Sequence, residues 1–395
     1  MPQKNLLFLY AMEAMAGMSR GSFLVCIGWT TLIVTGEVAR VGQVFVVGML
    51  TNILAGPLLG TVVDRFNRRT LVLVAHLGIG LVMATAGLAI ESGDSSTSLV
   101  FFATTITVFV LRLLYELSHD GLIRGNVSDD ALVHTIARFR TIHLLATAAG
   151  TVLVGVILDR FGAFAGFTMS ASMSILLLLP VIFVKGVTAF GGAKGLSGYF
   201  RDLLAGFAIL LKNPTVRLMA LLAAVALPVG QLSNAVLSSF IHDDLGMGGD
   251  VFGMVDSAWP LGGMAAAGFM SLGLGLFSRK NLVFFFSVGA GTATVVLSIS
   301  TSVPALVLMH GAMGFFVWFC RILIDARVLL ACGEENVGRA KVCIHVAFSL
   351  SAALMCLSPS FVPLQSTSGY FLFWGSLVVL GSLVLGAISW LRSNE

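Results

Sequence analysis

The sequence predicts an all-α membrane protein with twelve membrane-spanning helices in two six-helix halves. The first observation is composition: 57% of the 395 residues are hydrophobic and 11% are charged, with a mean hydropathy of +0.98. Soluble domains average about 25% charged residues, so a soluble fold could not hide this apolar surface. The second is length, because twelve spans of about 20 residues with short loops fit the chain. The third is a glycine-rich interruption near the middle of the chain.

The predicted N-terminal half covers residues 1–185 and contains six apolar segments. The first is expected to be a retained helix and not a cleaved signal peptide, because it is long and contains Glu13 and Arg20. Polar stretches at Ser92–Ser98 and Asn126–Asp130 are predicted as loops. The six predicted helices are Leu6–Val34, Val41–Val63, Thr70–Glu91, Leu99–His119, Ala131–Leu158 and Phe161–Val184.

Residues 186–213 are predicted to be a cytoplasmic linker. Within it, Tyr199–Leu211 has the pattern of an amphipathic helix on the inner membrane surface, and Asn213-Pro214 ends that helix. The C-terminal half covers residues 214–395, where Gly333–Arg339 is predicted as a charged loop. Its six predicted helices are Val216–Ile241, Val251–Phe277, Leu282–Ile299, Val303–Leu329, Lys341–Val362 and Gly369–Leu391.

Lysine and arginine positions predict the orientation. With a cytoplasmic N-terminus, about eighteen of the 23 Lys and Arg fall in inner loops or at the termini, and about two, Arg40 and Arg160, fall outside. Both termini are therefore expected in the cytoplasm. The halves also echo each other, because Arg112 and Glu116 recur as Arg321 and Asp325, 209 residues later (321 − 112).

The stretch Gly60–Arg69, GTVVDRFNRR, lies between two apolar runs. Its pattern G-x-x-x-D-R-x-x-R-R resembles the signature loop between helices 2 and 3 of the major facilitator superfamily of transporters. The resemblance implies the twelve-helix fold, secondary transport without a cofactor, and a monomer. It also implies an inner gate, in which Asp64 pairs with the inner end of a helix of the other half and the arginines bind nearby carboxylates. The gate residues are Asp64, Arg65, Arg68 and Arg69.

The alternative for these arginines is that they fix the topology and contact lipid headgroups. The C-terminal echo at Arg279-Lys280 lacks a preceding acid, so the predicted gate is asymmetric.

Charged residues inside the predicted helices are candidates for transport chemistry, because intramembrane charges are costly. Glu13 and Arg20 are seven residues apart and share a helix face. Glu13 is predicted to exchange protons and Arg20 to hold an anionic substrate; in the alternative, Glu13 extends to the membrane interface.

Two further acid–base pairs are spaced i,i+4. Arg112/Glu116 and Arg321/Asp325 either neutralise each other or face a cavity and separate when substrate or a proton arrives. The arginines are predicted to bind substrate, and both acids are predicted to couple protons.

Other polar residues carry weaker predictions. Asp256 is a further proton-coupling candidate. Gln231 and Asn234, after Pro228, are predicted to line the substrate path or to hold helices together. His76, His143, His310 and His345 are expected to be packing residues, with metal transport as the alternative. No bound metal is predicted, because the five cysteines form no C-x-x-C motif.

The segments Asn126–Leu158 and Leu196–Arg217 are similar to the branch that includes bacterial enterobactin exporters. This resemblance implies proton-driven export of an anionic siderophore across the bacterial inner membrane. The alternatives are a multidrug/proton antiporter and an importer of an iron chelate or small nutrient. Gly150–Gly162 lacks the proline expected of drug antiporters, which disfavours the first. An enzyme and a nucleic-acid-binding protein are not predicted, because no catalytic constellation, Walker loop or basic face is found.

Overall fold

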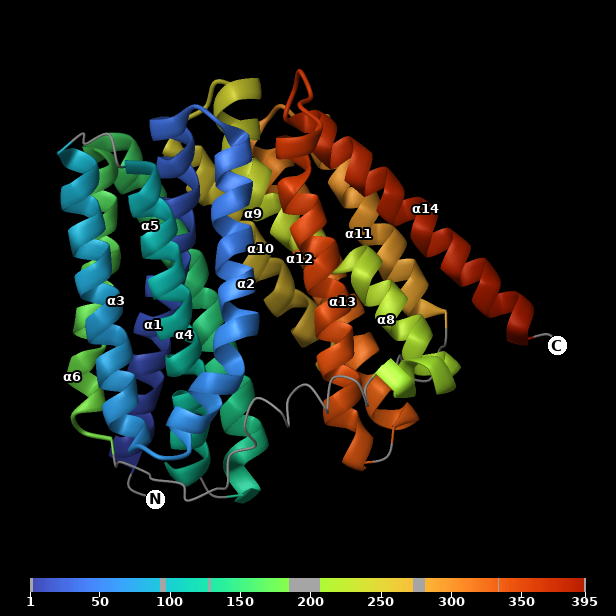
Figure 1. Cartoon of the computed structure of the whole chain (residues 1–395), viewed down its shortest axis with the longest axis horizontal. Helices are drawn as coiled ribbons and strands as arrows, with labels where there is room; N and C mark the ends of the chain where they lie inside the picture. The colour runs from blue at the N-terminus through green and yellow to red at the C-terminus, as the bar shows by residue number, and fades with distance from the viewer. Residues whose placement is uncertain are drawn as a thin grey trace. The chain divides into compact units, whose positions relative to one another are not determined.

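The computed structural model describes residues 3–92, 97–126, 129–184, 207–272, 281–332 and 334–393. In these ranges the regular structure is helical throughout (Figure 1). Nine helices in the described part are long and apolar enough to cross a membrane. One of them, α5 (Asp129–Leu176), bends at Gly162, whose φ of 79° is readily adopted by glycine, and so supplies two arms. With α10 (Gly249–Ser271) and α11 (Leu282–Ser298), the twelve predicted segments are present and the predicted fold class is confirmed.

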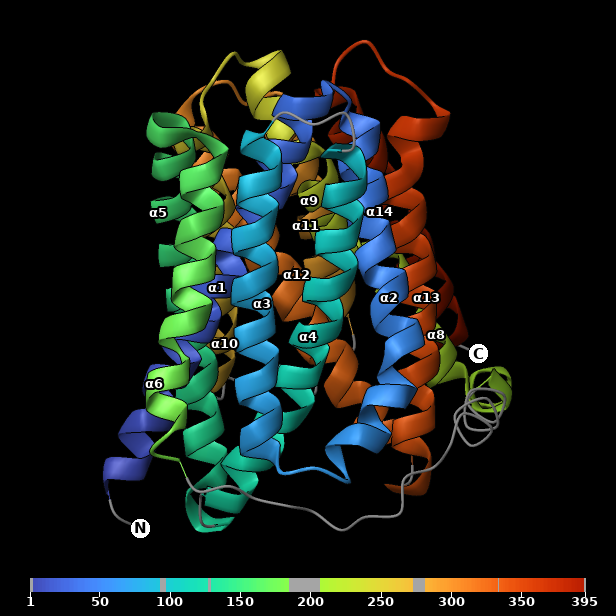
Figure 2. The same ribbon diagram turned by 60° about the vertical axis from the view of Figure 1, so that its left-hand side comes forward.

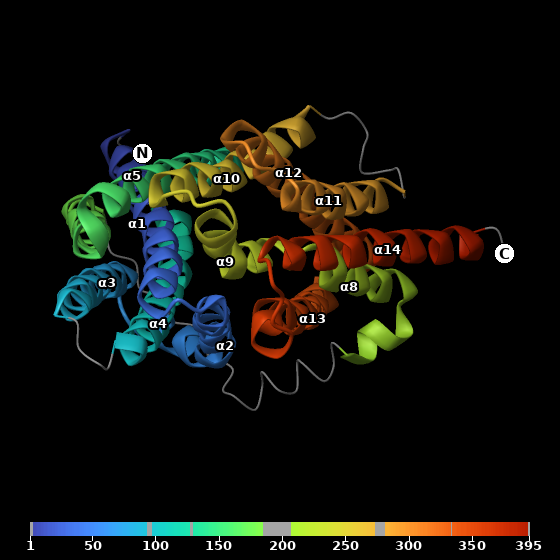
Figure 3. The same ribbon diagram turned by 90° about the horizontal axis from the view of Figure 1, so that it is seen from above.

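The chain divides into two compact units. The first contains the described residues within Met1–Glu37, Val47–Ser197 and Gly248–Ser257. Within it, α3 lies between α4 and α5 (Figure 2), while α1 has α5 on one side and α4 on the other (Figure 3). The helices that lie wholly in this unit are α1 (Gln3–Thr35), α3 (Arg68–Glu91), α4 (Thr97–Asn126), α5 and the short α6 (Leu178–Val181). Most of α2 (Val38–Val63) and the first part of α10 belong here too.

Glycines bring α1 and α5 into close contact. A β-carbon at Gly17 would lie 2.5 Å from the backbone oxygen of His143, and one at Gly150 would overlap the backbone oxygen of Met18. Helices in membranes pack closely where side chains are small, because apolar burial gives little attraction within lipid. The polar side chains of α1 are therefore held near those of α5.

The second unit contains the described residues within Val38–Val46, Gly198–Met247 and Ala258–Glu395. Within it, α11 packs against both α12 and α14, and α8 packs against α12 and α13. Asn213 begins α8, because its Oδ1 accepts the N–H groups of Thr215 and Val216 at 3.0 and 3.2 Å. The elements are α8 (Pro214–Ala226), α9 (Val229–Ser239), the π-helix η1 (Phe240–Asp244), α11, α12 (Val303–Ala331), α13 (Glu334–Phe361) and α14 (Ser368–Ser393); α10 contributes to both units.

One sequence prediction needs correction. The predicted loop Gly333–Arg339 is wrong from Glu334 onward, because α13 already begins there. The apolar run marks only the part of a helix that lies in the membrane. The helix continues past that run through Glu, Arg and Lys, because these residues are good helix formers. The predicted helix Val216–Ile241 lies within one apolar span, Pro214–Asp244, in which a turn at Leu227–Pro228 separates α8 from α9.

Several predictions fall wholly or partly outside the described residues. These are most of the linker 186–213, including Arg201 and Asp202 of the predicted surface helix, and the pair Arg279-Lys280. The described end of the surface segment, residues 207–212, is helical. The domain boundaries at 185 and 213 stay predictions.

Candidate functional site

Glu13 of α1 is buried in the first unit, with 7% of its surface exposed. Its carboxylate lies between two imidazoles from different helices: Nε2 of His119 on α4 at 3.1 Å and Nδ1 of His143 on α5 at 2.7 Å. The Tyr115 hydroxyl of α4 donates a hydrogen bond to the same carboxylate at 3.4 Å. Three helices thus place a carboxylate, two imidazoles and a phenol in one cluster, which we call the Glu13 cluster.

The Glu13 cluster brings three kinds of titratable group together. The His119 and His143 nitrogens lie 3.1 and 2.7 Å from the Glu13 carboxylate, and each contact is an ion pair when its imidazole is protonated. Neither ring nitrogen has the angles of a hydrogen bond to the carboxylate. A proton can therefore reside on the carboxyl group or on either ring.

Arg20 lies two turns beyond Glu13 on α1. Its Nη1 contacts Oε1 of Glu116 on α4 at 3.2 Å, and both side chains are nearly half exposed, at 42% and 49%. The i,i+4 spacing left open whether Glu116 pairs with Arg112 or faces a cavity; in the structure, Glu116 lines a pocket and forms its ion pair with Arg20 of another helix. The reason is that α1 and α4 are adjacent, which local spacing does not reveal.

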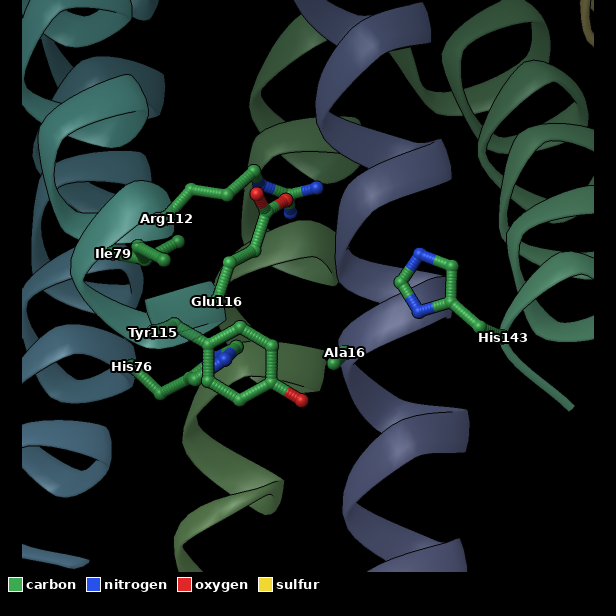
Figure 4. Close-up of a pocket in the computed structure, with 7 residues that line it drawn as sticks. All are labelled: Ala16, His76, Ile79, Arg112, Tyr115, Glu116 and His143. Carbon is green, nitrogen blue, oxygen red and sulfur yellow. The ribbon is translucent and has the colours of Figure 1, made fainter. Parts of the chain in front are cut away.

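A small pocket of the first unit opens beside this pair (Figure 4). Arg112 and Glu116 extend toward each other in it, and His76 lies next to Tyr115. The His76 ring meets the Tyr115 ring edge-on, with centroids 4.5 Å apart, and both His76 nitrogens are buried without a hydrogen-bond partner among the described residues. The lining residues are Ala16, His76, Ile79, Arg112, Tyr115, Glu116 and His143.

The second unit contains a counterpart, which we call the Arg321 pocket. Asp325 on α12 lies 3.5 Å from Nζ of Lys341 on α13, and the Arg321 guanidinium lies 5.5 Å from the centroid of the Trp318 ring. The cavity measures about 270 Å³. Its lining residues are Leu227, Arg321, Ile324, Asp325, Lys341, Ile344, His345 and Phe348.

The two pockets share several kinds of lining residue. Arg112 and Glu116 line one and Arg321 and Asp325 line the other, each with a histidine from the next helix, His143 or His345. Ala16 and Leu227 also correspond, at an offset of 211 (227 − 16), and the same offset from Glu13 leads to position 224, which is alanine. The Glu13 cluster thus has no acidic counterpart at that position.

The remaining polar candidates mainly form local contacts. Asn234 donates to Gln231 Oε1 at 3.3 Å on α9, and Ser233 bonds to His310 of α12 at 2.7 Å. Asp256 on α10 is half-buried, and no side-chain partner of its carboxylate is found among the described residues.

The Arg-rich stretch forms the turn from α2 to α3. Asp64 follows the last residue of α2, and Asn67 begins α3 by accepting the N–H of Arg69 at 3.0 Å. Arg68 lies against Gly121 of α4, where a β-carbon would overlap its guanidinium. The gate role of this turn stays a prediction.

Sequence reasoning missed three residues of these sites: His119, Tyr115 and Lys341. Tyr115 and His119 stand three and seven residues after Arg112, so they share its helix face, and that spacing was the available signal. His143 was expected to be a packing residue. It reaches Glu13 because α1 and α5 are in contact.

The structure is similar to solved transporters along nearly its whole length. The nucleoside transporter NupG matches with a TM-score of 0.77 at 14% identity, covering 97% of this chain and 98% of that one. The fold is the major facilitator fold. A POT family transporter in complex with 5-aminolevulinic acid matches at 0.72 and 12%, covering 96% and 95% of the two chains. Peptide transporter POT in complex with alafosfalin matches at 0.75 and 13%, covering 98% and 94%.

A family model, described as MFS_1 like family, matches residues 35–123 of this major facilitator fold, which include the Arg-rich turn. No curated protein sequence matches the chain. The structural comparisons therefore show the fold, and the family model covers residues 35–123 only.

Proposed function

We propose that this protein is a proton-coupled secondary transporter of a small anionic solute. The observation that carries the proposal is the Glu13 cluster: one buried carboxylate in contact with two imidazoles and a phenol, on three different helices. Ionisable groups inside a membrane protein are costly and mark ion or substrate pathways. A cluster that can hold a proton on several groups suits proton uptake and release.

The Arg20–Glu116 pair supports coupling between the Glu13 cluster and the adjacent pocket. Both side chains are nearly half exposed, and exposed ion pairs contribute about 0–1 kcal/mol. Such a pair opens and re-forms readily, so Glu116 can accept a proton when Arg20 moves away. Of the other predicted proton carriers, Asp325 is paired with Lys341, while Asp256 remains a candidate.

One proton per cycle is sufficient to bias the transport direction. A proton that crosses a potential of about 100 mV supplies about 2.3 kcal/mol. Because about 1.4 kcal/mol corresponds to a tenfold change in an equilibrium constant, this energy corresponds to about a 40-fold change in that constant. The Arg-rich turn, with Asp64, Arg65, Arg68 and Arg69, is proposed to act as the inner gate, with both termini in the cytoplasm.

The proposed substrate class follows from the arginines. Arg112 and Arg321 line pockets and Arg20 adjoins one, so positive charge is available to an anion. Of the structural neighbours, one was solved with 5-aminolevulinic acid, a small carboxylic acid. Export of a siderophore across the bacterial inner membrane is the narrower form of this proposal, and it rests on the sequence resemblance.

Transport in proteoliposomes tests the proposal. Vesicles with an imposed pH gradient are offered a panel of labelled small acids, 2,3-dihydroxybenzoate and 5-aminolevulinic acid among them. We expect at least one acid to accumulate with the gradient and to equilibrate when a protonophore collapses it. Accumulation that is unchanged by the protonophore would show that protons do not drive transport. Preferential movement of lipophilic cations would favour a multidrug transporter instead.

A further inference from the structure

We propose that the small pocket of the first unit binds one water molecule, held by His76 and Arg112, and that this water passes protons between Glu116 and the Glu13 cluster. The proposal rests on the proposed function, because it gives the route by which a proton moves inside that transporter. It also gives a role to His76, which the proposed function leaves without one.

The pocket adjoins both acids (Figure 4). Glu116 lines it and contacts Arg20 at 3.2 Å. Tyr115 and His143 also line it, and they contact the Glu13 carboxylate at 3.4 and 2.7 Å. Glu13 itself is not a lining residue, so a group between the two acids must carry a proton from one to the other.

The pocket is lined by polar groups that lack partners. Both ring nitrogens of His76 and Nε of Arg112 are buried without a hydrogen-bond partner among the described residues. His76 is only 1% exposed, so its nitrogens are shielded from bulk solvent. Buried polar groups are nearly always hydrogen-bonded, in many cases to an internal water molecule. These atoms therefore call for a ligand that both donates and accepts hydrogen bonds.

The size of the pocket selects that ligand. Its volume is about 10 Å³, and a single water needs about 10–15 Å³ of such space with about two to four polar partners. Nε–H of Arg112 is a donor, the Glu116 carboxylate is an acceptor, and a neutral His76 ring supplies one of each. The pocket thus suits one water and leaves no room for a substrate molecule.

The proton transfer through this water balances. A protonated Glu116 carboxyl gives its proton to the water oxygen, and the water gives one of its own protons to the Tyr115 hydroxyl oxygen. The Tyr115 hydroxyl proton passes to the Glu13 carboxylate, along the hydrogen bond between them. Glu116 ends as a carboxylate and Glu13 as a carboxylic acid, while the water and the phenol recover their composition. His76 and Arg112 hold the water without exchanging a proton, so His76 is a positioning residue.

Proton movement into proteoliposomes that contain a pH-sensitive dye tests the path. Tyr115→Phe and His76→Phe should each slow proton movement by about tenfold or more, while exchange of labelled for unlabelled acid continues. His76→Gln should recover part of the rate, because its amide can bond to the water. Thr105→Val is the matched control, since it removes another buried hydroxyl of α4 without a described partner, outside the pocket lining, and should behave as wild type.

A structure determined at a resolution that shows ordered water tests the site itself. We expect one water bonded to His76 and Arg112 in the wild-type protein, and none there in His76→Phe. A pocket without ordered water in the wild type would overturn the proposal. So would proton movement at the wild-type rate in Tyr115→Phe or His76→Phe. Thermal unfolding of each variant identifies a loss that is due to misfolding, and Tyr115→Phe, which removes a single oxygen, keeps the shape of the core.

Failure of this proposal and failure of the proposed function are distinguishable. If the wild-type protein moves no protons with any acid, the proposed function is refuted, and the ordered water still tests the site independently. If proton movement is abolished in Glu13→Gln but persists in Tyr115→Phe and His76→Phe, the transporter mechanism stands and the water path is wrong.

Discussion

Substitution of Gly17 by alanine should disrupt the Glu13 cluster without touching any of its polar groups. The new β-carbon would lie 2.5 Å from the backbone oxygen of His143 and 3.0 Å from the β-carbon of Ala146. Neither atom is the end of a flexible side chain, so α1 and α5 must separate by about 0.7–1 Å to restore van der Waals contact. The Glu13–His143 contact, now 2.7 Å, would lengthen to about 3.5 Å, which weakens the attraction between the carboxylate and a protonated imidazole.

Two measurements follow for Gly17→Ala. Overpacking of this kind costs about 1–3 kcal/mol, so the thermal unfolding temperature in detergent should fall. Proton-driven transport should fall with it, because the carboxylate loses one imidazole. Gly268→Ala is the matched control, since a β-carbon at Gly268 meets no atom within 4 Å. If Gly17→Ala unfolds and transports like wild type, the close approach of α1 and α5 does not hold the Glu13 cluster together.

Further predictions concern other contacts of the first unit. Arg20→Glu and Glu116→Arg should each reduce uptake into proteoliposomes, and the double variant, which reverses the pair, should recover at least part of that uptake. No recovery would mean that the 3.2 Å contact between the two side chains does not contribute to transport. Gly121→Ala should displace the Arg68 guanidinium, and we expect the maximal rate of transport to fall while substrate affinity changes little. An unchanged maximal rate would argue against a gating role of Arg68. His119→Gln should reduce proton-driven uptake more than His76→Gln, because His119 contacts Glu13, whereas His76 contacts the Tyr115 ring of the Glu13 cluster. The reverse order would contradict the role of the Glu13 cluster in proton exchange.

The helices were predictable because membrane burial dictates their composition. The segment Thr70–Glu91, for example, was expected from its apolar run, and α3 covers it and begins two residues earlier at Arg68. Where the chain leaves the bilayer this signal ends, which is why the first turns of α13 were expected to be a loop. The interruption at Leu227–Pro228 was signalled by the proline, although its extent was not.

Partnerships between charged side chains were harder to predict than the charges themselves. Each intramembrane charge stood out in the sequence, but its partner depends on which helices touch. Local spacing offered Arg112 as one possible partner of Glu116, whereas Arg20 makes the contact because α1 lies against α4. Likewise, His143 lies far from Glu13 in sequence, and only the close contact of α1 with α5 brings the two together.

The most direct test of the central claim is proton movement by Glu13→Gln in proteoliposomes that contain a pH-sensitive dye. Wild-type protein should acidify or alkalinise the lumen when a transported acid is added, and Glu13→Gln should abolish this signal while exchange of labelled for unlabelled acid continues. Glu91→Gln, at the exposed end of α3, is the matched control and should behave as wild type. Proton movement that persists in Glu13→Gln would contradict the assignment of the Glu13 cluster as the proton site.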